Sequence, residues 1–382
     1  MRPRNRAFEQ LDDYPFVRLE EEKRRIRARG MRVLDFSIGD PRERTPRWIR
    51  ERLVRGIPER ASYPTAAGLP ELRRAVVRWI ERRHRVRLDP DRHVLPSNGS
   101  KEAIYLLHQA LIEPSRERRV VLIPDPAYPV YEVGARFAGG IPERIPLDAE
   151  RGFVPDLDRI PPETLQRTAL LWLNYPHNPT GGVAGLELYR RALELARLHR
   201  FWVASDEAYS EIWFDRPPPS ALQAGTEGVL AIGSLSKRSA MTGYRTGFLA
   251  GDGELIGLLR KVRPSQGVAT PVFVQEAAIA AWGDEEHVVE QREIVRRKRA
   301  ILLPILRSKG LELAGSRATY YLWIRAPGDG GGGAFAQRLL EEGIAVAPGA
   351  LFGPGGERYV RMALVPEVEE CEEAAAILER IL

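Results

Sequence analysis

Three polar motifs each follow an apolar run of the sequence, and they contain the residue types that amine and acid–base chemistry requires. Asp206 and Tyr209 come just after one such run, Ser234 and Lys237 just after the next, and the segment 174–181 after an earlier one. Ligands of open α/β sheets bind beyond the carboxyl ends of the strands, so we expect these motifs to meet in one cleft. An amine, a carboxylate and a phenol gathered there would suit nucleophilic and acid–base catalysis.

Lysine is scarce in this chain, which narrows the candidates for any reaction that needs an amine. Only six of the 58 Lys and Arg residues are lysine. Lys237 is the lysine that stands in the predicted cleft. A lysine buried beside other cations has a lowered pKa, which helps its amine to act as a base.

Alternating apolar runs and amphipathic stretches predict how these motifs are positioned. Such alternation indicates a largely parallel sheet covered on both faces by helices. The expected strands are 119–123, 169–173, 201–205, 229–233 and 245–250, with helices at 101–112, 186–199 and 254–262.

The last third of the chain has a different pattern, which predicts a smaller α+β domain. A long helical stretch, 272–308, precedes short strands near 320–324 and 359–363 and a final helix. We therefore expect a large domain over 46–270 and a small domain built from 1–45 and 271–382. The glycine-rich run 328–333 is expected to be a flexible surface loop.

Composition and charge argue against several other classes of protein. The net charge is +6, but basic residues alternate with acidic ones, as on solvated helix faces, so nucleic-acid binding is not favoured. The single cysteine, Cys371, excludes an intrachain disulfide and has no metal-site spacing. The N-terminus lacks the apolar stretch of a signal peptide, and no apolar run is long enough to span a membrane. We expect a cytoplasmic enzyme that does not bind membranes.

The motifs, in their order along the chain, resemble those of the class I/II aminotransferases, which are pyridoxal 5′-phosphate (PLP) enzymes of fold type I. The resemblance covers about residues 10 to 380. The matching segments are 38–41, 63–73, 98–103, 126–131, 174–181, 206–209, 234–237, 243–247 and 359–361. This resemblance implies a fold type I large domain with a mostly parallel seven-stranded sheet, and PLP as the cofactor.

The resemblance also implies a role for each site residue. Lys237 matches the catalytic lysine that holds PLP as a Schiff base and moves protons during the reaction. Asp206 matches the carboxylate that keeps the pyridine nitrogen protonated, which the ring needs as an electron sink. Tyr209 and Asn178 match partners of the ring 3′-oxygen, and Tyr128 matches the residue that stacks on the ring.

The remaining residues match ligands of the two anionic groups in the site. The cofactor phosphate would be held at a helix N-terminus and by paired arginine donors. Its expected ligands are Gly99, Ser100, Lys101, Ser234 and Arg245. Arg361 would bind the substrate α-carboxylate, Asn174 would support it, and Gly39 would leave room for the substrate. Tyr63 would reach the phosphate of a neighbouring subunit, which implies a homodimer.

The reaction implied is transfer of an amino group between an amino acid and a 2-oxo acid. The segments 99–104 and 318–323 most resemble the succinyldiaminopimelate aminotransferases of lysine biosynthesis, although Tyr320 stands where that subfamily usually has Phe. N-succinyl-L,L-diaminopimelate with 2-oxoglutarate is therefore the first expectation. Aspartate or another amino acid is the alternative donor, and a PLP-dependent β-lyase or decarboxylase is the alternative enzyme. A PLP-binding regulator without turnover is disfavoured by the intact lysine and the lack of a DNA-binding domain. Lys101 could bind a second substrate carboxylate or only the phosphate.

Overall fold

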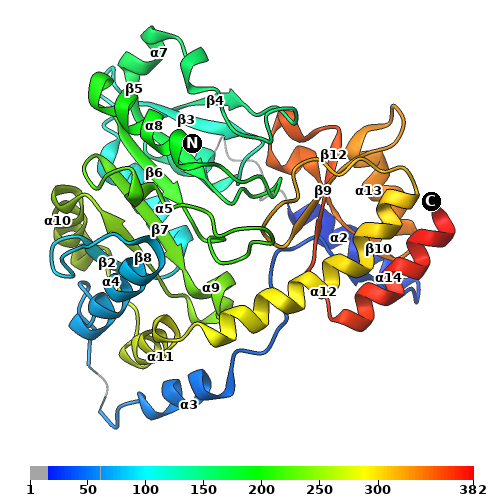
Figure 1. Cartoon of the computed structure of the whole chain (residues 1–382), viewed down its shortest axis with the longest axis horizontal. Coiled ribbons are helices and arrows are strands. Elements are labelled where there is room, and N and C mark those ends of the chain that lie inside the picture. The colour runs from blue at the N-terminus through cyan, green and yellow to red at the C-terminus, as the bar shows by residue number, and fades with distance from the viewer. Residues whose placement is uncertain (1–15, 61) are drawn as a thin grey trace, which may run out of the picture.

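The computed structural model describes residues 16–60 and 62–382, and its largest feature is a seven-stranded sheet (Figure 1). The strand order is β2-β8-β7-β6-β5-β3-β4. Only β8 runs antiparallel to its neighbours, while β7, β6, β5, β3 and β4 pair in parallel. The bounds are Val94–Ser97 (β2), Val120–Asp125 (β3), Ile141–Pro146 (β4), Thr168–Asn174 (β5), Trp202–Asp206 (β6), Val229–Ser234 (β7) and Gly247–Gly251 (β8). The predicted mostly parallel sheet is confirmed.

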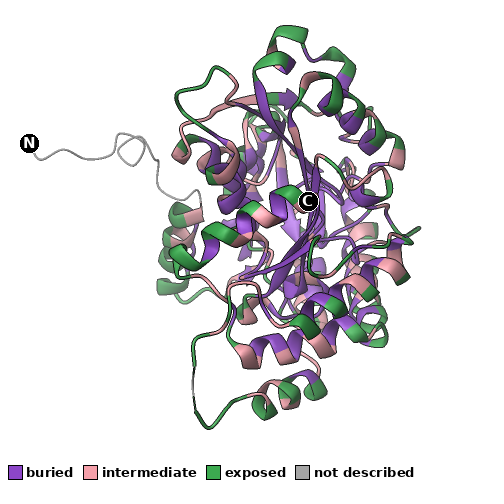
Figure 2. Ribbon diagram, turned by 90° about the vertical axis from the view of Figure 1, so that its left-hand side faces the viewer, coloured by how far each residue is buried: buried purple, intermediate pink, exposed green. Residues whose placement is uncertain are grey.

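Two hydrophobic clusters cover the two faces of this sheet, as the alternation of side chains along a strand requires. On β5, Leu171 and Leu173 belong to one cluster, and Leu170 and Trp172 belong to the other. The first cluster includes α4 (Pro70–His84), α8 (Leu186–His199) and α11 (Val272–Gly283). The second includes α5 (Ser100–Leu111), α6 (Val130–Phe137) and α10 (Gly253–Val262). Buried strands thus lie between helices whose outer faces are exposed (Figure 2).

A second lobe forms around a three-stranded antiparallel sheet, on the right of Figure 1. Its order is β11-β12-β9, with bounds Ala347–Pro348, Tyr359–Ala363 and Tyr321–Arg325. The early strand β1 (Leu34–Asp35) pairs in parallel with β10 (Ile344–Ala345), which brings the N-terminal segment into this lobe. The helices here are α2 (Phe16–Ala28), α12 (Glu286–Ser308), α13 (Gly331–Glu341) and α14 (Val368–Ile381).

The structure corrects the expected helical stretch 272–308. It is two helices, because the chain leaves helical geometry at Asp284 and Glu285 between α11 and α12. Helix α11 packs against α3 (Arg47–Arg55) and α4, so it lies with the core of the large sheet. The division into domains at residue 270 stays a prediction, and its residues 1–15 lie outside the described part.

The expectation for the glycine-rich run 328–333 is partly wrong. Its last residues, Gly331 to Gly333, begin helix α13. A Cβ built on Gly332 would lie 1.9 Å from the Tyr359 carbonyl oxygen. Glycine therefore allows α13 to begin in close contact with β12, a packing role that composition alone does not indicate.

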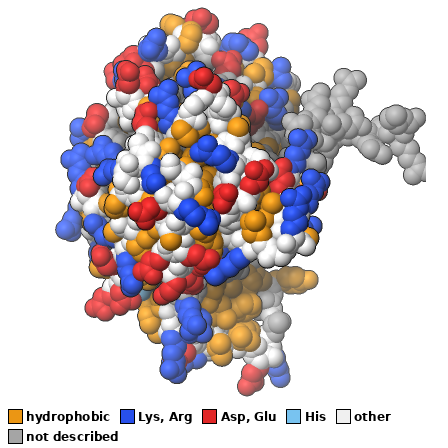
Figure 3. Space-filling view, turned by 90° about the vertical axis from the view of Figure 1, so that its right-hand side faces the viewer, with side chains coloured by type: hydrophobic (Ala, Val, Ile, Leu, Met, Phe, Trp, Pro, Cys, Tyr) orange, Lys and Arg blue, Asp and Glu red, His pale blue; other side chains and the backbone are white. Residues whose placement is uncertain are grey.

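The charge pattern on one face of the molecule agrees with the expected alternation of basic and acidic residues (Figure 3). On the face shown in Figure 3, basic and acidic side chains are interspersed. No helix in the described ranges is long and apolar enough to cross a membrane. Over the same ranges, no group of three or more His, Cys, Asp or Glu side chains could hold a metal ion, and Cys371 is buried.

Candidate active site

The predicted motifs meet at the carboxyl ends of adjacent parallel strands. Asn174, Asp206 and Ser234 are the last residues of β5, β6 and β7. They line a cavity of about 490 Å³ between the two lobes. Every predicted site residue except Gly99 and Tyr63 lines it, namely Gly39, Ser100, Lys101, Tyr128, Asn174, Asn178, Asp206, Tyr209, Ser234, Lys237, Arg245 and Arg361. A larger groove around Trp213 contains none of them.

Lys237 projects into the cavity from the short helix α9 (Leu235–Arg238). This helix begins with Ser234 as its cap, whose hydroxyl accepts a hydrogen bond from the Ser236 amide at 3.1 Å. The Lys237 amine donates to the Gly39 carbonyl oxygen. Burial lowers the pKa of Lys237 to about 8, which Asp40 opposes and the positive charge of Arg361 reinforces. The amine is therefore ready to give up a proton near neutral pH.

Asp206 lies buried on the cavity floor without a salt bridge among the described residues. Its carboxylate accepts hydrogen bonds from the Tyr131 hydroxyl at 2.8 Å and the Ala208 amide at 3.2 Å. Burial raises the pKa of Asp206 to about 6 in spite of both bonds. A buried carboxylate without a cation is costly, so this site favours a ligand that brings a protonated nitrogen.

Tyr131 was not among the predicted site residues, yet it fixes Asp206. Its ring stacks on Trp172, with centroids 4.7 Å apart and planes 19° apart. Tyr131 belongs to the matched segment 126–131, and this was the signal available in the sequence. Its hydroxyl needs a partner because the side chain is buried in the folded protein.

A cluster of donors lies where helix α5 begins, at the cavity lining formed by Ser100, Lys101 and Arg245. Gly99 caps this helix with a positive φ of 79°. A Cβ there would lie 2.6 Å from Nη2 of Arg245, so glycine is required for the close approach. Burial, followed by the charge of Arg245, lowers the pKa of Lys101. A helix N-terminus beside two cationic side chains is suited to a phosphate.

Arg361 enters the cavity from β12 in the second lobe and is held in a fixed orientation. Only 3% of the residue is exposed. It donates to Oδ1 of Asn178 at 2.8 Å and to the Ser37 carbonyl oxygen at 2.8 Å. Its Nε has no partner within the described residues, which leaves donors for an incoming carboxylate.

The amide of Asn174 lies at the junction of these groups. Its Nδ2 donates to the Asp206 carbonyl oxygen at 2.8 Å, and its Oδ1 accepts from the Asn178 amide at 2.9 Å. Asn174 thus ties the end of β5 to β6 and to the loop that orients Arg361.

Tyr63 is the predicted residue that the single chain does not bring to the site. Its side chain is fully exposed and does not line the cavity. The sequence also gave no role to Tyr321 and Phe352, whose rings flank the Arg361 guanidinium. An aromatic residue type alone does not indicate a binding site, because buried aromatic residues are usual in any core.

The donor set fits the cofactor that the motifs implied. Lys101 and Arg245 line the cavity, and Gly99 lies against Arg245, so these residues would offer donors to a phosphate. The floor presents the Asp206 carboxylate to a ring nitrogen, and Lys237 lies within the same cavity. The structure therefore provides a complementary group for each polar part of PLP.

Comparison with known proteins gives a consistent result. The family model for aminotransferase class I and II matches residues 31–378. An LL-diaminopimelate aminotransferase of Dehalococcoides mccartyi is 38% identical over 98% of this chain and 97% of that protein. Another, from Aquifex aeolicus, is 39% identical over 97% of each chain. A solved structure described as a probable N-succinyldiaminopimelate aminotransferase from Thermus thermophilus has a TM-score of 0.89 and 35% identity, covering 96% of this chain and 100% of that one.

Proposed function

Because the chain belongs to the class I and II aminotransferases, we propose that its amino donor is LL-diaminopimelate and its amino acceptor 2-oxoglutarate. Members of this family catalyse transamination with PLP as their cofactor. Membership of the family therefore confirms the predicted enzyme class and cofactor. When bound, PLP supplies an electron sink that stabilises negative charge at the substrate Cα. The names of the relatives at 38% and 39% identity support the donor.

The residues of the chain would divide the work of the reaction. Arg361, already oriented by Asn178 and Ser37, would bind the substrate α-carboxylate. Lys237 would hold the cofactor between turnovers and then move a proton at the substrate Cα, a task suited to its pKa of about 8. Asp206 would keep the ring nitrogen protonated. The rings of Tyr128, Tyr321 and Phe352, which line the cavity, would limit the water near the reacting atoms.

The side chains that would bind the distal end of the substrate determine which amino donor we favour. Lys101 lines the same cavity as Arg361, so carboxylates at both ends of a substrate would meet a cation. Asp40 also lines the cavity and is exposed to solvent. LL-diaminopimelate has a distal ammonium as well as a distal carboxylate, and Asp40 and Lys101 would offer a charge of opposite sign to each. The presence of both charged side chains in the cavity lining is the observation that supports the free diamino acid.

N-succinyl-L,L-diaminopimelate, which the sequence motifs favoured, is the second candidate. Its support is the similarity to the probable N-succinyldiaminopimelate aminotransferase of Thermus thermophilus. In this derivative an amide replaces the distal ammonium, so Asp40 would have no charged partner. The two candidates therefore differ in their need for the Asp40 carboxylate.

The test measures glutamate formed from 2-oxoglutarate by purified PLP-loaded protein. The donors are LL-diaminopimelate, N-succinyl-L,L-diaminopimelate, aspartate and alanine, compared by kcat/KM. We expect LL-diaminopimelate to be best, and Asp40→Asn to raise its KM about tenfold, with little change for aspartate. A higher kcat/KM for aspartate or alanine would contradict the proposal. Cystathionine, which has a leaving group on its β-carbon, is included as a control, and release of ammonia and pyruvate from it in place of glutamate formation would indicate a β-lyase.

We also propose that two chains form a homodimer that completes each site. The support is the exposed Tyr63 and an apolar hollow of about 820 Å³ next to the cavity, lined in part by Tyr105, Leu106 and Val133. Symmetric pairing would place each Tyr63 at the neighbouring phosphate site. Mixing inactive Tyr63→Ala with inactive Lys237→Ala should restore some activity, because one site per mixed dimer would be intact. A fully active monomer at assay concentration would exclude this arrangement.

A further inference from the structure

Tyr321 has contacts with both halves of the active site, although the motifs assigned it no role. It is the first residue of β9, only 2% exposed, and its side chain lines the cavity. Its hydroxyl oxygen lies 2.5 Å from that of Tyr209. The Arg361 guanidinium carbon lies 4.2 Å from the centre of its ring. One side chain therefore contacts a predicted partner of the cofactor 3′-oxygen and the predicted carboxylate ligand.

Gly39 shows that the fold reserves space for the Tyr321 hydroxyl. A Cβ built on residue 39 would lie 2.1 Å from that oxygen. The family resemblance implied that this glycine leaves room for substrate, but the nearest atoms to a Cβ there belong to Tyr321. Since the Gly39 carbonyl accepts the bond from Lys237, the same loop contacts both side chains.

We propose that Tyr321 is a positioning residue with two separable functions, in which its hydroxyl orients Tyr209 toward the cofactor and its ring holds Arg361 toward the substrate. The proposal rests on the roles proposed above for Tyr209 and Arg361. It adds a residue that couples the two.

The hydroxyl function follows from the number of hydrogens available. Each tyrosine hydroxyl has one hydrogen to donate and two lone pairs that accept. When Tyr321 donates to Tyr209, the single hydrogen of Tyr209 stays available for the cofactor 3′-oxygen. Bonds in such a chain polarise one another, so the bond from Tyr209 becomes stronger. A stronger bond to the negative 3′-oxygen favours the deprotonated chromophore and lowers its pKa.

The ring function follows from the burial of Arg361. Its guanidinium carbon lies over the rings of Tyr321 and Phe352, at 4.2 Å and 4.4 Å from the two centroids. Cation–π contacts are strongest when the cation is desolvated, as it is here. The Tyr321 ring, and not its hydroxyl, should therefore keep the guanidinium facing the carboxylate.

The experiment compares Tyr321→Phe, which removes only the hydroxyl, with Tyr321→Leu, which removes the ring as well. Both are made in the full-length PLP-loaded protein. The first measurement is the pKa of the bound cofactor from its absorbance as a function of pH, without substrate. The second is the dissociation constant of maleate, an unreactive dicarboxylate. Neither depends on which amino donor the enzyme uses.

Both variants should raise the chromophore pKa by about 0.3–0.6 unit, a fraction of one charge-assisted hydrogen bond. Tyr321→Phe should bind maleate within about twofold of the native protein, and Tyr321→Leu about 5- to 30-fold more weakly. In a Tyr209→Phe background, Tyr321→Phe should add no further shift, because the bond it supports is already absent.

An unchanged or lowered pKa in Tyr321→Phe would overturn the hydroxyl function. Equal weakening of maleate binding by both variants would overturn the ring function. If Tyr321→Leu does not fold, Tyr321→Met provides the same test with an unbranched side chain. A native protein that fails to bind PLP, or to bind maleate through Arg361, would instead refute the proposed site.

Discussion

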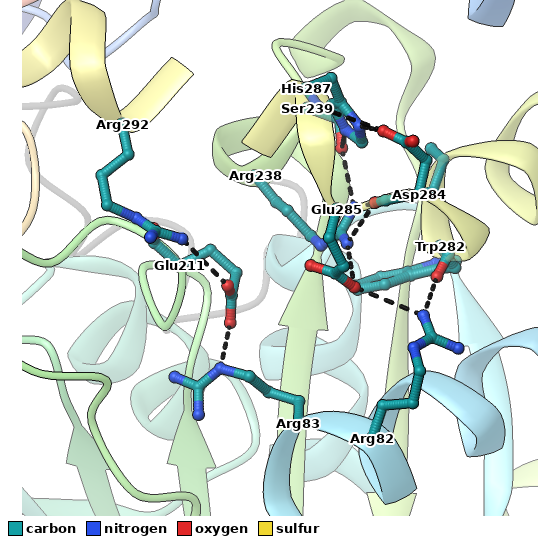
Figure 4. A network of polar contacts seen from close by, with 11 residues as sticks. Arg82, Arg83, Glu211, Arg238, Ser239, Trp282, Asp284, Glu285, His287 and Arg292 are labelled. Carbon is teal, nitrogen blue, oxygen red and sulfur yellow. Dashed lines mark hydrogen bonds and ion pairs between the residues drawn. The ribbon is translucent and has the colours of Figure 1, made fainter. Parts of the chain in front are cut away.

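Two cations, the half-buried Lys237 and the buried Arg238, are neighbours on helix α9 but have different surroundings. The Lys237 amine faces the cavity, and within the described residues its hydrogen bond goes to a neutral carbonyl. Successive residues of a helix point roughly 100° apart, so Arg238 faces away from the cavity. It lies where α11 ends and α12 begins (Figure 4).

Arg238 has a partner on nearly every side. It donates to the carbonyl oxygens of Ala281 at 2.7 Å and Asp284 at 2.9 Å, and forms an ion pair with Glu285 at 2.9 Å. The ring of Trp282 lies 5.0 Å from its guanidinium carbon. Behind the same turn, His287 joins Asp284 to Ser239, as Figure 4 shows.

The charge of Lys237 serves chemistry, whereas the charge of Arg238 serves stability. Burial lowers the pKa of both side chains, but only the lysine falls to about 8. Arginine stays charged in proteins, so Arg238 can anchor the turn without reacting. The reactive amine of Lys237 has few partners. The contacts of Arg238 hold helix α9, and therefore Lys237, in place.

The largest expected effect is on catalysis by Lys237→Ala. Activity should fall by about 10⁴-fold or more, because the nucleophile and the proton carrier are lost together. The thermal midpoint of the cofactor-free protein should not fall, since a poorly paired buried amine is removed. Glutamate formation and a melting curve measure the two effects. Lys261→Ala, on the exposed side of α10, is the matched control and should change neither.

The next largest effect is on stability, from Arg238→Ala. Unfolding should become easier by about 2–4 kcal/mol, because the carbonyls of Ala281 and Asp284 lose their donor and a cavity forms beside the rings of Trp79 and Trp282. Chemical denaturation of the cofactor-free protein measures this loss. Arg297→Ala, an exposed arginine of α12, should have almost no effect. Equal losses of stability in the two variants would mean that the buried contacts of Arg238 contribute no more than an exposed arginine does.

A smaller effect of opposite sign is expected for Asp206→Asn. Burial raises the folded-state pKa of Asp206 from 3.8 to about 6, so the cost of its charge is complete above pH 6 and disappears as the pH falls below 3.8. The variant should stabilise the cofactor-free protein by about 1–3 kcal/mol at pH 7.5. This gain should vanish near pH 4, and PLP-dependent activity should drop. Denaturation at both pH values tests the sign, which a loss at pH 7.5 would contradict.

The smallest effect is expected for Tyr320→Phe, which places the usual subfamily residue beside α9. The Tyr320 hydroxyl donates to the carbonyl oxygen of Lys237 at 2.9 Å and is fully buried. Losing this bond should cost about 0.5–1.5 kcal/mol of stability and change kcat by less than about fivefold. If kcat fell as far as in Asp206→Asn, the bond from Tyr320, and not the contacts of Arg238, would be the main support that positions the reactive amine.

Patterns within a few residues determined much of this protein from its sequence. Apolar runs ending in Asn174, Asp206 and Ser234 predicted parallel strands whose carboxyl ends share one edge. The order of the motifs predicted the family and the cofactor, which are confirmed. Strand alternation and turn residues are local properties, so a sequence alone can reveal them.

Tertiary structure decided which distant side chains meet. Tyr131 and Asp206 lie far apart in sequence and meet only when α6 packs on the large sheet. Tyr321 and Tyr209 are also distant in sequence, and they meet only when the second lobe packs against the first. The break between α11 and α12 is another example, because the pattern of the segment 272–308 suits one helix until Arg238 and Trp282 fix the chain at Asp284. The neighbours Lys237 and Arg238 look alike in the sequence. Only packing on different sides of α9 leaves one reactive and the other paired, because the dielectric and the partners around a charge are set by the folded chain.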